Sequence, residues 1–157
     1  MNTNELTINK FYSAFQKKDF RSMQECYADT ATFSDTVFQN LDSKQVKAMW
    51  EMLCLQGKDL RLEFKNIWAD ENVGKAEWIA TYTFSATERK VVNRIQAEFR
   101  FENGKIVKHI DTFDFYAWAK QALGFTGFLL GWTPFLRSKI QKKAMQNLAK
   151  FRAVNEK

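Results

Sequence analysis

Residues 99–118, FRFENGKIVKHIDTFDFYAW, place two runs of alternating polar and apolar side chains on either side of Asn103 and Gly104. A period of two is typical of half-buried strands, and Asn-Gly is a frequent turn between antiparallel strands. After residue 115 the apolar spacing becomes helical. The stretch therefore predicts a β-hairpin followed directly by a helix.

The register of this hairpin decides which way Asp111 points. A two-residue turn would place Phe99 on the face of Lys108, whereas a three-residue loop with Gly104 left-handed in a bulge shifts the pairing by one. We favour the three-residue loop because it gathers the apolar residues on one face. That face would hold Ile95, Ala97, Phe99, Phe101, Val107, His109, Asp111 and Phe113.

The residues before the hairpin predict more strands and then helices. Alternation over residues 60–68 and 76–85 indicates two half-buried strands, which with 91–101 and 105–115 make an antiparallel meander. Further upstream, residues 6–27 have apolar side chains at helical spacing. A break at Lys17, Lys18 and Asp19 divides this region into two helices, with Asp19 as N-cap of the second.

A third helix is predicted over residues 42–57, with Asp42 or Ser43 as its cap and Gly57 as its end. Residues 29–40 form a short extended segment between the second helix and this one.

The C-terminal part carries most of the net charge of +6. A last helix should begin at Pro134, with an apolar face of Phe135, Leu136, Ile140, Ala144, Leu148 and Phe151. Its basic residues favour a solvated face, and no nucleic-acid-binding motif accompanies them. The preceding apolar run, GFTGFLLGW, predicts a lid or a dimer contact, ahead of contact with a membrane surface.

The cysteine and histidine content argues against metal or disulfide chemistry. Cys26 and Cys54 are isolated in helical patterns, which indicates buried reduced thiols and a cytoplasmic location. His109 is the only histidine, and a lone histidine with scattered acids is a poor metal site, so we expect no cofactor. The first residues do not have the pattern of a signal peptide.

Two motifs resemble one known family. CYADTATFSDTVF (26–38) and the closing hairpin at 99–118 are similar to those of the nuclear transport factor two-like superfamily, which includes ketosteroid isomerases and SnoaL-like cyclases. The resemblance implies an α+β cone-shaped fold, in which a curved antiparallel sheet wraps around N-terminal helices, plus an extra C-terminal helix. We expect residues 1–157 to form a single domain, and the resemblance covers residues 5–120 of it. The remaining residues, 121–157, would be a lid segment and a basic C-terminal helix. It also implies a homodimer through the outer face of the sheet.

The resemblance is uneven at the site residues. Asp35 stands where the isomerases keep their base and Tyr27 where they keep a supporting tyrosine, but Phe11 and Ala97 replace their two oxyanion donors. Because enolisation depends on those donors, steroid isomerisation is not expected. SnoaL-like cyclases resemble the chain better, since they use one pocket aspartate on the last strand, where Asp111 lies.

These observations predict a pocket for a small hydrophobic, carbonyl-bearing ligand. Asp111 would be the general base or hydrogen-bond acceptor, assisted by His109 and Asp35. The predicted ligand-binding residues are Phe11, Tyr12, Phe15, Tyr27, Trp50, Trp78, Tyr82, Phe99 and Phe113. The alternatives are a hydrogen-bonded structural Asp111, a core His109, a turn-forming Asp35, and a non-catalytic binding or dimerisation module.

Overall fold

The computed structural model describes residues 1–156 of the protein, which contain six helices and five strands. The helices are α1 (Thr3–Gln16), α2 (Phe20–Glu25), α3 (Ser43–Gln56), α4 (Phe115–Leu123), α5 (Phe125–Leu130) and α6 (Pro134–Asn155). The strands are β1 (Tyr27–Ser34), β2 (Arg61–Ala69), β3 (Val73–Phe84), β4 (Arg89–Glu102) and β5 (Lys105–Thr112). This composition confirms the predicted α+β class.

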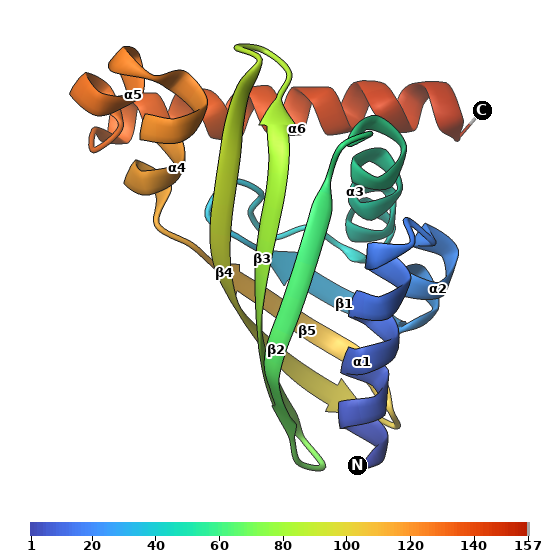
Figure 1. Ribbon diagram of the computed structural model, residues 1–157. Coiled ribbons are helices and arrows are strands. Elements are labelled where there is room, and N and C mark those ends of the chain that lie inside the picture. The colour runs from blue at the N-terminus through green and yellow to red at the C-terminus, as the bar shows by residue number, and fades with distance from the viewer. Residues whose placement is uncertain (157) are drawn as a thin grey trace.

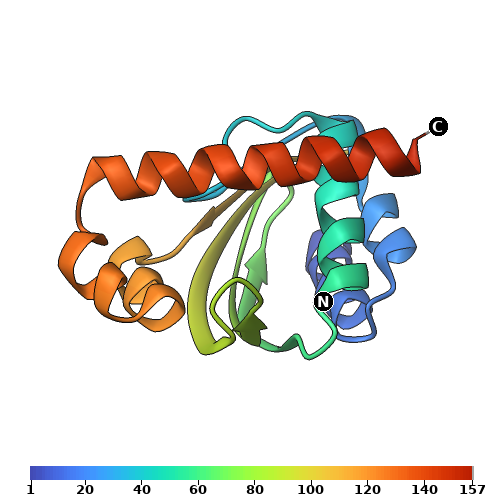
Figure 2. The ribbon, with the colours of Figure 1, turned by 90° about the horizontal axis from the view of Figure 1, so that it is seen from above.

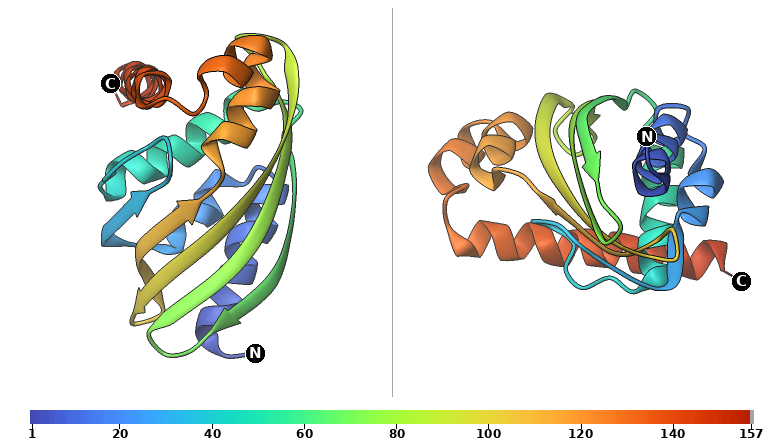
Figure 3. Two further views of the ribbon diagram at one scale, coloured as in Figure 1. Left: turned by 90° about the vertical axis from the view of Figure 1, so that its left-hand side faces the viewer. Right: turned by 90° about the horizontal axis from the view of Figure 1, so that it is seen from below.

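The strands form one sheet in the order β1-β5-β4-β3-β2. Strands β2 to β5 are the predicted antiparallel meander, whereas β1 pairs with β5 in parallel, so the sheet is mixed. The long strands curve strongly, and α1 lies against their concave side (Figures 1 and 3). The result is the expected cone, with a sheet that stays open.

Helix α6 crosses the wide end of this cone. It runs from the side of α5 to the side of α3, as Figures 1 and 2 show from two directions. Leu136 and Leu148 are its buried side chains, whereas Phe135, which we expected on the apolar face, is 73% exposed. Phe135 lies in the first turn of α6, on the side opposite the residues that face the cone. No helix among residues 1–156 has the length and apolarity needed to span a bilayer.

The helix boundaries follow from side-chain caps. Asp19 accepts a hydrogen bond from the backbone N–H of Ser22, and Asp42 forms a reciprocal capping box with Gln45. Each cap satisfies N–H groups that have no partner within the helix. Gly57 ends α3, and Asp114 caps α4 by accepting from Ala117. The predicted caps at Asp19 and Asp42 and the predicted end at Gly57 are thus confirmed, whereas the cap at Asp114 was not predicted.

The closing hairpin corrects our prediction of its turn. Asn103 and Gly104 both have positive φ, and Glu102 pairs with Lys105, so the turn has two residues rather than three. Next to the turn Phe101 pairs with Ile106, but the next residue of β4, Arg100, pairs with Lys108. Val107 therefore has no partner on β4 and forms a bulge. This bulge restores the predicted pairing further along. Phe99 lies opposite His109, and Ala97 lies opposite Asp111.

Candidate functional site

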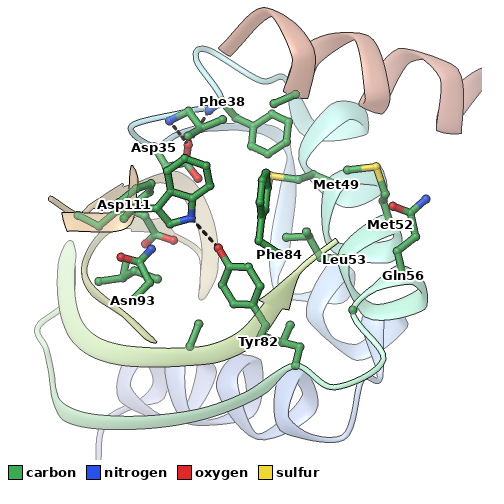
Figure 4. A pocket seen from close by; sticks show the side chains of 18 of the residues that line it. Asp35, Phe38, Met49, Met52, Leu53, Gln56, Tyr82, Phe84, Asn93 and Asp111 are labelled. Atoms are coloured by element: carbon green, nitrogen blue, oxygen red, sulfur yellow. Dashed lines mark hydrogen bonds between the residues drawn. The ribbon is translucent and has the colours of Figure 1, made fainter. Parts of the chain in front are cut away.

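A cavity of about 360 Å³ lies between the concave face of the sheet, α3 and α6. Polar groups gather on one side of it, where Figure 4 shows Asp35, Asp111 and Asn93, while Met49 and Leu53 of α3 lie across from them. A cavity of this size and composition suits a small molecule with a polar end and an apolar body.

The structure brings seven of the twelve predicted site residues to this cavity and leaves five away from its walls. Those that line it are Phe15, Asp35, Trp50, Trp78, Tyr82, Asp111 and Phe113. Those packed in the core behind it are Phe11, Tyr12, Tyr27, Phe99 and His109. Of this core group, Tyr27 and His109 are connected to lining residues by hydrogen bonds.

Asp111 is held by a chain of buried hydrogen bonds. The indole Nε1 of Trp50 donates to the hydroxyl of Tyr27 at 2.9 Å, and that hydroxyl lies 2.7 Å from Nδ1 of His109. Nε2 of His109 lies 2.8 Å from Oδ1 of Asp111. Together these contacts connect α3, β1 and β5 into one network that ends at the cavity.

The chemistry of the members gives this network a direction. Indole N–H can only donate, so the Tyr27 oxygen accepts from Trp50, which leaves the Tyr27 hydrogen free to be donated to Nδ1 of His109. With Nδ1 as the acceptor, Nε2 carries a proton and donates it to Asp111. Every donor and acceptor in the chain is thereby satisfied, and one carboxylate oxygen of Asp111 is held in place.

Local sequence explains why Asp111 can occupy this position. The residue opposite it on β4 is Ala97, whose small side chain leaves room beside the carboxylate. His109 is fully buried, with the rings of Phe33 and Phe99 at 4.9 and 4.3 Å between centroids. This aromatic packing keeps water from the histidine, while Asp111, which is 4% exposed, reaches the cavity wall.

Asp35 is both a turn-forming aspartate and a cavity carboxyl. Its Oδ1 accepts hydrogen bonds from the backbone N–H groups of Val37 and Phe38, directly after β1. Desolvation raises the pKa of Asp35 to about 7, with a further contribution from the negative charge of Asp111, although the two backbone donors act in the opposite direction. Near neutral pH this carboxyl is therefore divided between its neutral and charged forms.

Several lining residues were not predicted. Asn93 lies on the same inward face of β4 as Ile95 and Ala97. A polar residue among apolar residues on a buried face could have indicated a cavity residue from the sequence. Trp118 of α4 also lines the cavity and donates from Nε1 to the hydroxyl of Tyr82 at 2.8 Å. Its position depends on how α4 turns back over the sheet, which spacing along the chain does not give.

The lid differs from the one we expected. No residue of α5 lines the cavity, whereas Ile140, Lys143, Ala144 and Asn147 of α6 do. The covering element is therefore the basic helix, and the apolar run lies at its N-terminal end (Figure 2). Within residues 1–156 no three or more His, Cys, Asp or Glu residues are arranged to hold a metal ion.

Comparison with solved structures places the fold among known proteins. IdmH of Streptomyces antibioticus, a candidate polyketide cyclase, is 18% identical, with a TM-score of 0.63 over 76% of this chain and 98% of its own. An LEH-like epoxide hydrolase of M. tuberculosis is 19% identical, with a TM-score of 0.60 over 85% and 95%. TerC, co-crystallized with polyporic acid, is 12% identical, with a TM-score of 0.65 over 76% and 98%. At these identities the likeness concerns the fold.

No curated protein is significantly similar to the sequence. The profile of one family, however, matches residues 8–109, which include most of α1, the strands up to His109 and most of the cavity wall. The match covers well over half of the chain and agrees with the cone-shaped fold and its inward-facing last strand. The protein therefore belongs to the SnoaL-like domain family.

Proposed function

We propose that the protein binds a small, largely hydrophobic carbonyl compound and that Asp111 removes a proton from the carbon next to the carbonyl, in a cyclase or isomerase reaction of the SnoaL-like type. The observation that supports this most is the position of Asp111. One oxygen of its carboxylate is held by buried His109, while the residue lines a mainly apolar cavity. A fixed base beside an apolar cavity is what proton abstraction from carbon requires.

The proposed step balances with the groups present. The C–H bond breaks as Asp111 takes the proton, and the electron pair moves onto the carbonyl oxygen as an enolate forms. Asp35 suits the second role, because a carboxyl whose pKa is about 7 can donate a hydrogen bond to that oxygen from its neutral form. The proton then returns from Asp111 at another carbon, or the enolate carbon attacks a second carbonyl and closes a ring, and the alkoxide that forms takes the proton from Asp111.

His109 acts through Asp111 as a positioning residue. Because its ring is fully buried and its Nδ1 is already engaged by Tyr27, it has no contact with the cavity. Its Nε2–H fixes the orientation of the carboxylate, which leaves Oδ2 as the oxygen available to a ligand. Asp111 and Asp35 are therefore the two groups expected to touch substrate.

The shape of the cavity narrows the class of ligand. The polar side near Asp35 and Asn93 would take the carbonyl oxygen or a hydroxyl, and the methionines Met49 and Met52 would contact the apolar body. Methionine side chains adapt to irregular apolar shapes. Among the solved proteins of this fold, one is a candidate polyketide cyclase and another was crystallized with polyporic acid. Both support an aromatic or polyketide-like carbonyl compound.

A second candidate is a binding protein without turnover. The observation in its favour is that both carboxyls already have structural contacts, Asp35 with the backbone of its own turn and Asp111 with His109. In that case Asp111 would accept a hydrogen bond from a ligand hydroxyl and nothing more. This function predicts ligand binding with no exchange of carbon-bound hydrogen.

The two functions are separated by measuring binding and proton exchange on the same compounds. Thermal unfolding with a panel of hydrophobic carbonyl compounds identifies those that raise the midpoint of the wild-type protein. Each such compound is then incubated with the protein in deuterated water, and NMR follows deuterium entering next to the carbonyl. We expect exchange with wild type and a loss of about a hundredfold or more in Asp111→Asn.

Asp114→Asn is the matched control, because Asp114 lies three residues away and caps α4 outside the cavity. It should bind and exchange like wild type. Binding without exchange in the wild-type protein would favour the second candidate. If no compound of the panel binds, or if Asp111→Asn exchanges at the wild-type rate, the proposed role of Asp111 is wrong.

A further inference from the structure

Helices α4 and α5 form a tightly packed pair. A Cβ placed on Gly127 of α5 would lie 1.9 Å from the carbonyl oxygen of Ala119 in α4, so only glycine permits this approach. The hydroxyl of Tyr116 also donates to the carbonyl oxygen of Phe128 at 3.0 Å. Because the glycine side of α5 is fixed against α4, its larger side chains must point away from the protein.

The outcome is a concentrated group of exposed apolar side chains, which we name the apolar cluster. It consists of Phe125 (75% exposed), Phe128 (57%), Leu129 (48%), Leu130 (44%), Trp132 (71%) and Phe135 (73%). The other large exposed hydrophobic side chains of residues 1–156 are scattered over the chain. Single exposed apolar residues are ordinary, whereas six within residues 125–135 are typical of a contact surface.

The surroundings of the apolar cluster are positively charged. From residue 115 to residue 155 the sequence has no Asp or Glu, while it has seven cations: Lys120, Arg137, Lys139, Lys142, Lys143, Lys150 and Arg152. Lys139 and Lys142 follow Phe135 at spacings of four and seven, which places them on the same outward side of α6. All three side chains are exposed.

We propose that the apolar cluster and the outward lysines of α6 bind the surface of an anionic lipid membrane. Aromatic side chains such as Trp132 and Phe135 favour the headgroup region of a bilayer, and nearby lysines are attracted to its negative charge. Among residues 1–156 no helix is long and apolar enough to span a membrane, so the contact is with the surface. This inference does not depend on the proposed chemistry of the cavity.

Charge favours this occupant over a second copy of the chain. A two-fold interface through the apolar cluster would bring the same segment against itself. Each copy would contribute the exposed Lys139 and Lys142 and no acid between residues 115 and 155, so like charges would meet across the contact. An anionic bilayer supplies both the apolar environment and the opposite charge.

Co-sedimentation with lipid vesicles tests the proposal. The full chain should pellet with vesicles made of equal parts phosphatidylglycerol and phosphatidylcholine, should stay in solution with phosphatidylcholine alone, and should be released by salt. The double variant Trp132→Ser/Phe135→Ser should bind about tenfold more weakly for each aromatic removed. Lys139→Glu/Lys142→Glu should also bind weakly. Circular dichroism should show all variants folded, because the replaced side chains are exposed.

Matched controls lie on other surfaces of the protein. Trp68→Ser removes a tryptophan that is 49% exposed on β2, and Lys108→Glu reverses an exposed charge on β5, so both should bind vesicles like wild type. The proposal fails if the wild-type protein does not pellet with anionic vesicles, or if Trp132→Ser/Phe135→Ser pellets as well as wild type. It also fails if that variant converts a wild-type dimer into a monomer without changing vesicle binding.

Discussion

The Asp35→Asn substitution should make the protein more stable in alkaline solution. Burial raises the pKa of Asp35 from 3.8 to about 7, so the folded chain binds a proton more tightly than the unfolded chain. Between these two pKa values the folded state carries more protons, and the stability of the wild-type protein falls as the pH rises. Above about pH 7 the folded protein bears the full cost of a charged, desolvated carboxylate.

The magnitude follows from the difference between the two pKa values. A difference of about 3 corresponds to about 4 kcal/mol, and allowing for partial contact with solvent gives about 2 to 4 kcal/mol. Asn can still accept from Val37 and Phe38 through its Oδ1, so the turn is preserved without the charge. Asp35→Asn should therefore raise the unfolding midpoint by about 4 to 15 °C at about pH 9, with little change at about pH 4.

Thermal unfolding of both proteins across this pH range is the assay, and Asp70→Asn is the matched control. Asp70 forms the same turn, with Oδ1 accepting from Asn72 and Val73 at 2.8 Å, but it is exposed and those donors lower its pKa. Asp70→Asn should therefore not stabilise the protein at alkaline pH. If Asp35→Asn is no more stable than wild type at about pH 9, or if the difference does not depend on pH, Asp35 is an ordinary carboxylate and its proposed role as a donor is refuted.

Three other substitutions and one deletion test the packing around the site and between α4 and α5. Tyr27→Phe leaves two buried polar partners unsatisfied and should cost about 2 to 5 kcal/mol in urea unfolding, whereas Tyr12→Phe removes a buried hydroxyl with no partner among residues 1–156 and should be neutral or stabilising. Gly127→Ala should separate α5 from α4 and speed the exchange of backbone amide hydrogens in both helices. Unchanged exchange would show that the two helices are not in close contact at Gly127. Deleting Val107 removes only the bulge residue, so ligand binding through Asp111 should survive, and its loss would show that the bulge itself shapes the cavity.

The sequence predicted those parts of the fold that depend on local chemistry. The caps at Asp19 and Asp42, the stop at Gly57 and the alternating strands all follow from interactions within a few residues of the chain. The parallel pairing of β1 with β5 was not predicted, because nothing within residues 27–34 specifies which distant edge the strand joins. Long-range pairing depends on the shape of the whole sheet, which one strand does not encode.

The candidate site shows the same division. The inward position of Asp111 was predicted from apolar patterning, which is a property of the strand, while the turn was assigned incorrectly. Both turns place His109 and Asp111 on one face of β5, since they are two residues apart, and the apolar pattern decides which face is buried. The hydrogen bonds from Trp50 through Tyr27 to His109 could not be predicted, because their partners are far apart in the sequence. The separation is 23 positions for Trp50 and Tyr27 and 82 positions for Tyr27 and His109.

His109 is fully buried and does not reach the cavity, which limits what it can do in a reaction. A histidine that contacted a ligand could take the proton itself, whereas one that is fully buried and hydrogen-bonded at both nitrogens can only orient the acid beside it. In the proposed reaction, proton transfer therefore falls to Asp111, which lines the cavity, and not to His109. If turnover follows the proposed step, it should fall as the pH rises through about 7, where Asp35 loses the proton that it would donate.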